Sequence, residues 1–323
     1  MQSIHARNVS EALYLAKQAL ETNGVEVQTR NGAALEFPTP VMTTYTNSRE
    51  RVLFYPQRDA NPYFHFMESL WMLAGRNDVE WISRFNKRMA EYSDSGTHLQ
   101  GAYGYRWRKY FHTDQLETVV HRLRTYENDR RTVLTMWDAE WDLRFDNGCK
   151  DHPCNTHIYF SVRNKELYVT VCNRSNDMIW GAMGANAVHM SILQEYIASK
   201  VGVKVGIYTQ FSNNLHAYLD TLQTLQGMQP DYDSYGSRAI SPTRIVIDHT
   251  SFLEELDWFM KDPIKKHPYY NAVFPELAQP MCKVWEAWKQ KEIFLALELS
   301  KEIVHDDWHM AVHEWLERRI NNG

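Results

Sequence analysis

The segment DHPCNTHIYF holds the residue of this chain that is best suited to nucleophilic chemistry, Cys154. Pro153 fixes the backbone directly before the thiol, and a strand-like run begins directly after it. A thiol at the start of a strand is a reasonable position for a covalent nucleophile. A lone cysteine is weak evidence, because most cysteines are small buried hydrophobic side chains. The residues that accompany Cys154 must therefore decide its role.

A polar run, NRSND, stands at the end of the next strand-like segment, and its arginine follows Cys154 by twenty residues. The two strands of a hairpin would bring this run close to the thiol. The guanidinium of Arg174 would then stabilise the thiolate, and Arg174 together with Ser175 would bind a phosphate.

A second basic pair, Arg130 and Arg131, precedes the strand-like run TVLTMW. Taken alone, such a pair is typical of a solvated turn. As a phosphate clamp it would have to lie in a loop, since adjacent side chains on a strand point to opposite faces. The residues themselves leave both interpretations open.

The periodicity of apolar residues predicts the elements that must position these side chains. Helices are expected over residues 10–21, 61–92, 115–126 and 185–202, and the segment 61–92 should divide into two helices near Gly75. Ser10 is the expected N-cap of the first helix, and Gly202 should end the last one. Strands are expected over 25–46 as a pair around Asn31-Gly32, 132–137, 157–174 as a hairpin turning at Asn164-Lys165, 203–212 and 244–248.

The length of 323 residues and the hydrophobic share of 44% allow one large domain with a sizeable core. We expect an α/β catalytic domain over residues 1–248 and a helical C-terminal extension over 249–323, with 228–242 as a loop. Aromatic residues make up 13% of the chain and include 11 Trp, which suggests thick cores or pockets that stack flat ligands. The Trp-rich faces of the extension are expected to be core.

Composition also excludes several classes of protein. A net charge of -5 argues against a general nucleic-acid coat. No apolar stretch has the length of a transmembrane helix or a signal peptide, so no membrane partner is expected. The four cysteines form no CxxC pair, so no metal is expected. We expect free thiols and a cytoplasmic location, or the host cytoplasm if a phage encodes the chain.

Four stretches, in order along residues 25–225, resemble the thymidylate synthase and pyrimidine nucleotide hydroxymethylase family. They are NPYFHFMESLWMLAG, GAYGYRW, HPCN, and NRSNDMIWGAMGANAVHMS followed by SNNLHAYLD. They are similar to the family's glutamate-bearing helix, its active-site tyrosine loop, its nucleophile segment and its nucleotide-binding run. The resemblance implies a sandwich with a mostly antiparallel, twisted sheet, helices on one face and a dimer contact on the other.

The resemblance also implies a reaction. Cys154 would attack C6 of a pyrimidine nucleotide monophosphate and make C5 a carbon nucleophile toward the methylene of 5,10-methylenetetrahydrofolate. Glu68 would organise a proton-transfer water network near C4 and C5, and Tyr103 would assist removal of the proton at C5. Asp177 would bind the folate ring.

Further residues would bind the nucleotide. Arg174 and Ser175, helped by Arg30, would hold the 5′-phosphate. His216 and Tyr218 would contact the 3′-hydroxyl of the sugar, although without the resemblance they could equally be boundary residues of a helix.

Arg130 and Arg131 match a pair that the family donates from the neighbouring subunit. The resemblance therefore implies a homodimer whose two active sites are shared between the subunits.

Asn186 would decide the base. An amide at this place pairs with the O4 and N3–H edge of uracil, whereas a carboxylate would favour cytosine. The interval from Gly181 to Asn186 is one residue longer than is usual in the family, and strict spacing would put Ala185 there instead. We prefer an insertion within the run AMGA, because His216 and Tyr218 fit that shifted register.

Two departures from thymidylate synthase bear on the product. The chain continues through about seventy helical residues instead of a short closing tail, and Met89 and Tyr92 stand near positions of family tryptophans. Both departures should admit water, which turns the methylene into hydroxymethyl, whereas exclusion of water allows hydride transfer and a methyl product. We therefore expect a dUMP 5-hydroxymethylase, while a helical lid could restore thymidylate synthase.

Other classes stay open from the residues alone. Within the family, a dCMP or CMP hydroxymethylase is a further alternative. A non-catalytic nucleotide-binding regulator would bind dUMP without needing Cys154. A Cys–His hydrolase would use Cys154 with His152 or His157, but no third orienting residue is apparent and the arginines would be unexplained.

Overall fold

A six-stranded sheet forms the centre of the molecule, which is described here by a computed structural model over residues 1–144 and 148–321. The strand order is β1-β4-β9-β7-β6-β5. The strands are β1 Gln2–Ala6, β4 Val41–Tyr45, β9 Lys204–Ser212, β7 Glu166–Asn173, β6 Asn155–Arg163 and β5 Val133–Thr135. The β4–β9, β7–β6 and β6–β5 pairs are antiparallel, and the β1–β4 and β9–β7 pairs are parallel.

A smaller sheet of four strands lies beside the main one, in the order β2-β3-β10-β8. Its strands are β2 Val25–Thr29, β3 Gly32–Glu36, β10 Leu215–Tyr218 and β8 Asn176–Asp177. The β2–β3 hairpin turns at Arg30-Asn31 and re-enters at Gly32, whose φ of 122° suits only glycine. The turn places Arg30 at the end of the small sheet where Tyr218 of β10 pairs with Ala34 of β3.

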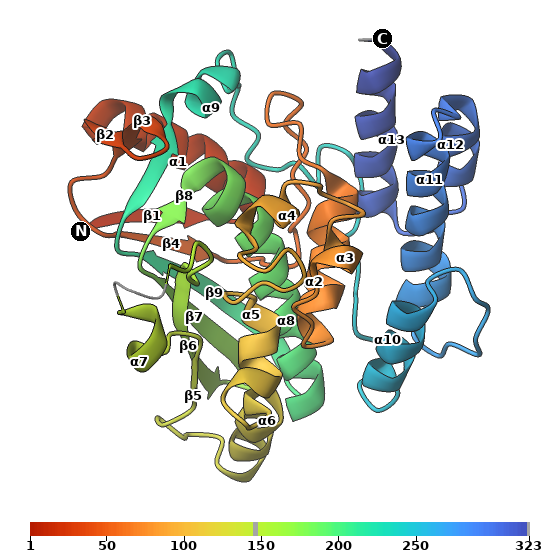
Figure 1. Cartoon of the computed structure of the whole chain (residues 1–323), viewed down its shortest axis with the longest axis horizontal. Coiled ribbons are helices and arrows are strands. Elements are labelled where there is room, and N and C mark those ends of the chain that lie inside the picture. The colour runs from red at the N-terminus through yellow and green to blue at the C-terminus, as the bar shows by residue number, and fades with distance from the viewer. Residues whose placement is uncertain (145–147, 322–323) are drawn as a thin grey trace.

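Helices cover one face of the main sheet (Figure 1). They include α1 Val9–Asn23, α2 Pro62–Leu73, α6 Gln115–Thr125 and α8 Asn186–Val201. Nearly all of α8 is buried, because α2 and α6 pack on one side of it and β7 and β9 on the other. Gly202, with a φ of 84°, ends α8 as the sequence predicts.

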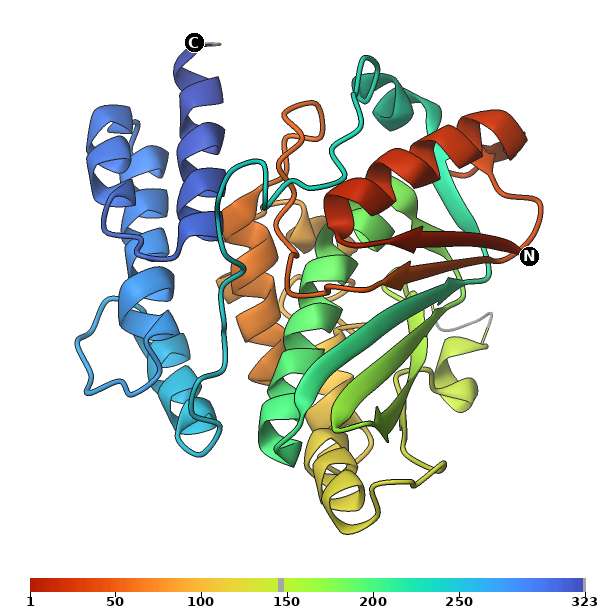
Figure 2. The same cartoon turned by 180° about the vertical axis from the view of Figure 1, so that it is seen from behind.

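The opposite face of the main sheet is open along β9, β7 and β6 in the described part of the chain (Figure 2). Side chains along β7 and β9 alternate between buried and half-buried, which is the pattern of a sheet packed on one face. The expected α/β fold, with a mostly antiparallel sheet and a helical C-terminal region, is therefore confirmed.

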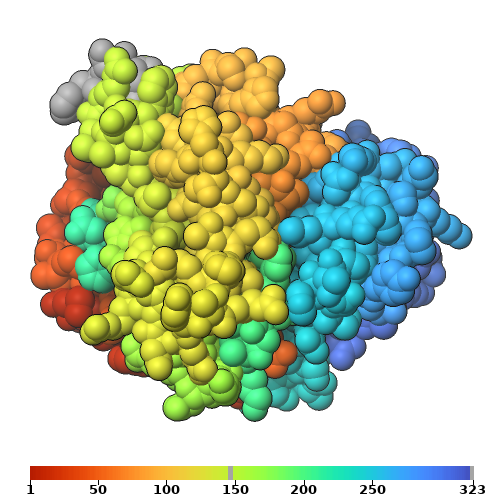
Figure 3. All heavy atoms as spheres, turned by 90° about the horizontal axis from the view of Figure 1, so that it is seen from below, coloured from red at the N-terminus to blue at the C-terminus, as the bar shows by residue number. Residues whose placement is uncertain are grey.

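The C-terminal helices form a bundle beside α2 (Figures 1 and 3). They are α10 Phe252–Lys261, the π-helix η3 Phe274–Ala278, α11 Gln279–Lys289, α12 Ile293–Ser300 and α13 Asp306–Asn321. The ring of Tyr63 on α2 lies 5.0 Å from Trp285 and 5.4 Å from Trp315, so the Trp-rich faces are core, as expected. Among the described residues, no helix combines the length and apolarity needed to cross a membrane.

Several boundaries differ from those predicted. Asn8, not Ser10, caps α1, because its side chain accepts from the amide of Glu11. The second half of the segment 61–92 is two one-turn helices, α3 Val79–Ile82 and α4 Met89–Tyr92. The expected strand pair at 25–46 is three strands, since β4 is separate from the hairpin.

The run GAYGYRW is helical rather than a loop. It forms α5 Tyr103–Tyr105 and continues as the π-helix η1 Arg106–Tyr110. A Cβ on Gly104 would collide with the backbone of Met72, so this glycine allows α5 to lie directly on α2.

The predicted strand at 244–248 is wrong, and side chains explain why. The amides of Ile245 and Val246 donate to the carboxylate of Glu195 at 2.6 and 3.2 Å, and the next two amides donate to Asn271. The segment is therefore held in place by side-chain acceptors instead of by a neighbouring strand.

We predict that Glu195→Ala lowers the free energy of unfolding by about 3–5 kcal/mol, because it leaves Arg51 buried without its charge partner. The two side chains are 2.6 Å apart and only 1% and 4% exposed. Urea denaturation measures the loss. The matched control, Glu21→Ala, removes a more exposed pair with Lys17 and should cost less than about 1 kcal/mol. Equal losses for the two variants would contradict this role of Glu195.

Candidate active site

Cys154 lies at the start of β6, where the antiparallel β6–β7 pairing sets it beside Arg174. The amide of Arg174 donates to the carbonyl of Cys154 at 2.9 Å. Its guanidinium donates to the carbonyls of Pro153 and His152 at 3.0 and 3.1 Å and lies 3.9 Å from the Cys154 sulfur. The hairpin predicted from the sequence thus brings thiol and cation together, and Arg174 also fixes the backbone that carries the thiol.

Opposing influences act on the thiol. Burial raises the pKa of Cys154 above its usual range, and the cations of Arg174 and Arg30 oppose that rise. Tyr103 lies against the Cys154–Asn155 backbone, and burial raises its pKa well above that of a free phenol, with a further contribution from Cys154. At neutral pH the phenol of Tyr103 therefore keeps its proton.

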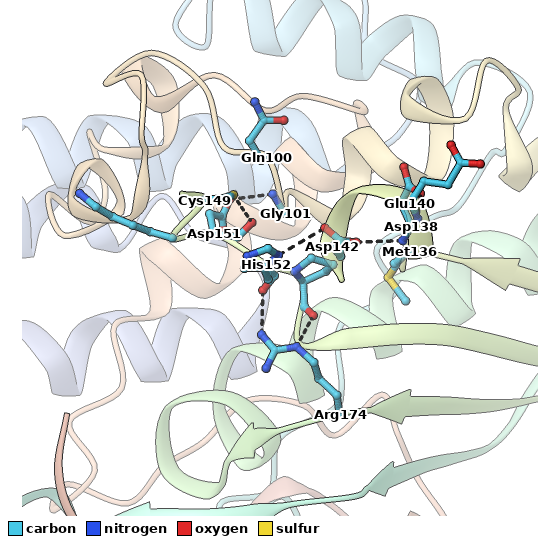
Figure 4. A network of polar contacts seen from close by, with 12 residues as sticks. Gln100, Gly101, Met136, Asp138, Glu140, Asp142, Cys149, Asp151, His152 and Arg174 are labelled. Atoms are coloured by element: carbon cyan, nitrogen blue, oxygen red, sulfur yellow. Dashed lines mark hydrogen bonds and ion pairs between the residues drawn. The ribbon is translucent and has the colours of Figure 1, made fainter. Parts of the chain in front are cut away.

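A buried ion pair between Arg106 and Asp142 supports the nucleophile segment, and Figure 4 shows Asp142 beside His152 of that segment. Both nitrogens at the end of Arg106 donate to the carboxylate of Asp142, at 2.5 and 2.9 Å, and both side chains are 0% exposed. Asp142, at the end of α7 Ala139–Asp142, also lies 3.5 Å from the ring of His152. The carboxylate of Asp151 accepts from the amide of Gly101 at 2.8 Å.

A cleft of about 590 Å³ opens beside this segment. Three cations reach it, from Arg30, Lys150 and Arg174, and Ser175 adds a hydroxyl. The other side chains used below that line the cleft are Glu36, Trp137, Asp142, His152, Asn214, His216 and Tyr218. Cations from separate elements, together with a hydroxyl, suit a phosphate group.

The smaller sheet supplies polar groups suited to a sugar hydroxyl. Asn214 bonds Glu36 through its amide nitrogen, so its oxygen is free to accept from Nδ1 of His216 at 2.8 Å. With Nδ1 protonated, Nε2 of a neutral His216 is an acceptor for a hydroxyl. Burial lowers the pKa of His216, which favours that neutral form. Tyr218 lies next to it, and its hydroxyl accepts from Asn31 at 3.2 Å. Both residues belong to strand β10, and Tyr218 is also the N-cap of the short helix α9 Leu219–Thr224.

Asp177 lies at the base of the π-helix η2 Met178–Ala185, where one of its oxygens accepts from the amides of Ile179 and Trp180. The pKa of Asp177 is raised by burial, with His216 and Arg58 opposing. Arg58 stacks 4.2 Å over the half-exposed ring of Trp180, and its buried Nη1 has no partner among the described residues. A carboxylate, a flat ring and an unpaired cation suit a flat heterocycle that ends in carboxylates, as folate does.

The extra residue before Asn186 coincides with η2. This π-helix contains non-helical backbone at Met183 and Gly184, after which α8 begins at Asn186. A wide turn is the usual way in which a helix absorbs one added residue. The amide of Asn186 is 8% exposed and donates to Asn176 at 3.1 Å, whereas Ala185 has no side-chain group that could pair with a base. The geometry is compatible with the shifted register, and the role of Asn186 stays a prediction.

Glu68 projects from α2 toward α8 and contacts His189 there, with 3.1 Å between Oε2 and Nε2. Its side chain is 13% exposed, so the carboxylate is largely but not fully buried. Tyr103 reaches the site from α5, which lies on α2 one turn beyond Glu68.

Arg130 and Arg131 do not join the site of their own chain. Both are exposed, and Arg131 contacts Asp129 at 3.4 Å. Since Val133 pairs with Tyr159 in an antiparallel register, residue 131 lies at the level of residue 161 of β6. This is about 23 Å from Cys154 at roughly 3.3 Å per residue.

Sequence reasoning missed the residues that support the site through carbonyls and carboxylates. Asp142 gives His152 the orienting carboxylate that the sequence did not reveal, but Arg106 already neutralises it. His157 lies on the open face of the sheet, where its ring contacts Thr156 and Tyr159. The hydrolase alternative therefore gains no geometry in which a histidine contacts the thiol. The signal that could have indicated Asp142 is its position in DAEWD, directly after the TVLTMW strand.

Comparison with known proteins adds independent findings. The family model of thymidylate synthase matches residues 13–233. A deoxyuridylate hydroxymethyltransferase of Pseudomonas phage M6 is 43% identical over 335 aligned positions, which cover 99% of this chain and 95% of that protein. A protein of the same description from Bacillus phage SP01 is 37% identical over 205 positions, covering 60% of this chain and 53% of that protein. A putative thymidylate synthase of Methanothermobacter marburgensis is 37% identical over 116 positions, covering 36% and 50%.

We predict that Arg174→Leu slows alkylation of Cys154 by iodoacetamide at mildly alkaline pH. Loss of the cation raises the pKa of the thiol further, and one pKa unit lowers the thiolate fraction about tenfold. Peptide mass spectrometry separates Cys154 from the other cysteines. Arg163→Leu, which removes an exposed guanidinium at the far end of β6, is the matched control and should leave the rate unchanged. Unchanged labelling in Arg174→Leu would refute the electrostatic role.

Proposed function

We propose that this chain, which belongs to the thymidylate synthase family, is a dUMP 5-hydroxymethylase that takes its one-carbon unit from 5,10-methylenetetrahydrofolate. Its membership confirms the resemblance seen in the sequence and makes the chain a one-carbon transferase.

One observation carries the proposal: the similarity to the phage M6 hydroxymethyltransferase covers 99% of this chain. It therefore includes the C-terminal helices, which the thymidylate synthase model does not match. Those helices are therefore shared with a relative that is named as a hydroxymethyltransferase and lie outside the thymidylate synthase match. We keep residues 1–248 as the proposed catalytic domain and the rest as its extension.

The cleft supports a nucleotide monophosphate as substrate. Arg30, Arg174 and Ser175 would hold the 5′-phosphate, and His216 with Tyr218 would hold the sugar hydroxyl. With the phosphate and the sugar held in this way, the base would extend toward Cys154. The amide of Asn186 would pair with the O4 and N3–H edge, which supports uracil over cytosine.

Covalent attack by Cys154 is the proposed first step. The thiolate adds to C6, the C5=C6 electrons move toward the C4 carbonyl, and C5 becomes nucleophilic. Bound methylenetetrahydrofolate would supply the electrophilic carbon. Asp177 would hold its ring, while Trp180 and Arg58 offer a flat surface and a positive charge beside it. The protonated phenol of Tyr103 would order the water that removes the C5 proton.

Thymidylate synthase itself is the second candidate, and the family model together with the archaeal relatives supports it. The two reactions share the methylene attached to C5 and differ only in whether water or hydride reaches it. The test is therefore a product test and not a binding test.

We predict that dUMP and methylenetetrahydrofolate yield 5-hydroxymethyl-dUMP without dihydrofolate, as followed by mass spectrometry and absorbance. Turnover of dUMP should exceed that of dCMP. Cys154→Ser should abolish both turnover and the covalent adduct with 5-fluoro-dUMP, while Cys282→Ala, in helix α11 away from the cleft and from the open sheet face, is the matched control. Dihydrofolate with a methyl product would establish thymidylate synthase instead, and no turnover of any pyrimidine nucleotide would refute the family activity for this chain.

A homodimer with shared sites is the proposed assembly, formed through the open face of the main sheet. Tyr159 and Val133 are 46% and 44% exposed on strands that end beside Arg130 and Arg131. The two arginines precede β5 and lie beside the end of β6 that is far from Cys154, so they do not reach the phosphate site of their own chain. A symmetric partner packed sheet to sheet would carry them to the other subunit's cleft.

We predict that mixing subunits restores activity between two inactive variants, Cys154→Ser and the double variant Arg130→Ala with Arg131→Ala. Random pairing in a symmetric dimer leaves about a quarter of the sites with an intact thiol and intact arginines. The measurement is turnover after co-expression, compared with each variant alone. Absence of restored activity in a verified mixed dimer would contradict the sharing of sites.

A further inference from the structure

A buried histidine contacts the carboxylate that is assigned to the proton network. Nε2 of His189 on α8 lies 3.1 Å from Oε2 of Glu68 on α2, and these helices pack side by side. The imidazole is 2% exposed and the carboxylate 13%. Nε2 makes no aligned hydrogen bond among the described residues, so the contact is an ion-pair distance between ring and carboxylate. A buried ring held this close to a carboxylate restricts the positions that the carboxylate can take.

Neither ring nitrogen of His189 has a hydrogen bond within the described residues. Nδ1 and Nε2 are both buried without a hydrogen-bond partner, and of the two only Nε2 is known to lie close to the Glu68 carboxylate. Buried polar atoms that the protein leaves unpaired are commonly met by ordered water. The ring therefore faces Glu68 at one nitrogen and offers the other to a water molecule.

Helix geometry places His189 on the same side of α8 as Asn186. Asn186 and His189 are three residues apart on α8, so their side chains project from the same side of the helix. Asn186 is the residue proposed to pair with the O4 and N3–H edge of uracil. The next ring atom beyond C4 is C5, and His189 stands one helical turn further along than Asn186.

On the basis of the proposed hydroxymethyl transfer, we propose that His189 is a positioning residue that holds Glu68 as the base for the attacking water. Once the methylene is attached to C5, one O–H bond of water breaks and its proton passes to the Glu68 carboxylate. The oxygen bonds to the methylene carbon, whose π electrons move into the C4 enolate. The enolate re-forms the carbonyl and the C5=C6 bond, and Cys154 leaves C6 as a thiolate.

The other groups around the pair fit this assignment. His65 lies one turn before Glu68 on α2, and burial together with the charges of Arg58 and His189 lowers its pKa well below the usual value. His65 therefore stays neutral at physiological pH and does not compete for the Glu68 carboxylate as a cation. Among these side chains, the one with a contact to the Glu68 carboxylate is His189.

The test compares His189→Gln and His189→Leu with wild type. General-base steps contribute factors of about 10²–10⁴, so His189→Leu should lower formation of 5-hydroxymethyl-dUMP by about a hundredfold. The covalent complex of 5-fluoro-dUMP and methylenetetrahydrofolate on Cys154 should form as in wild type, because no water attacks in that complex. Added 2-mercaptoethanol should trap the accumulated methylene as a thioether. His189→Gln keeps a side-chain donor and should recover part of the rate.

Ser191→Ala is the matched control, since Ser191 is fully buried two residues further along α8 and its hydroxyl donates to the carbonyl of Val188 at 2.9 Å. It should match wild type in adduct, product and thioether. Loss of the fluorinated adduct in both His189 variants would mean a structural role and would overturn the inference. Unchanged partition between thioether and hydroxymethyl product in either folded variant would also overturn it. Failure of wild type to make any hydroxymethyl product would instead sink the proposed function.

Discussion

The arrangement of this active site depends on the buried contact between Arg106 and Asp142. Two fully buried charges are stable only when their hydrogen bonds are nearly complete, and here they are. Besides the carboxylate, Arg106 donates to the carbonyls of Gln100 and Met136 at 2.9 and 2.6 Å, and Asp142 accepts from the amide of Asp138 at 2.8 Å. The pair thereby joins the π-helix η1, the end of β5 and helix α7 into one rigid support for the segment that carries Cys154.

Arg174 then does a different task from the one that its charge alone suggests. Its guanidinium donates to two backbone carbonyls of the nucleophile segment while remaining exposed toward the cleft. The cation is thus oriented before any phosphate arrives, which lowers the entropic cost of binding an anion. The same orientation keeps a positive charge near a thiol whose burial disfavours the thiolate. In the proposed reaction, one side chain would couple substrate recognition to the readiness of the nucleophile.

The sequence predicted well what local patterns determine and poorly what distant side chains determine. The β6–β7 hairpin and helix α8 follow from alternation, helical periodicity and the stop at Gly202. The extended segment before α10 was mistaken for a strand because its apolar run has the right pattern, while the acceptors that hold it, Glu195 and Asn271, lie elsewhere in the chain. His189 was missed for a similar reason: a histidine on a buried helix carries no signal until the helix that faces it is known.

The π-helix before Asn186 shows how a protein of this kind can change what its pocket recognises. Each residue added to a regular helix rotates everything beyond it by about 100°, which would turn the whole of α8 away from its partners. The wide turn at Met183 and Gly184 takes up the additional length locally, so the packing of α8 on the sheet is retained. Insertion or deletion at this turn can therefore exchange the residue at the head of α8 without altering the helix behind it. With the pairing proposed for Asn186, such a change would be a route to new base specificity that requires no substitution inside the core.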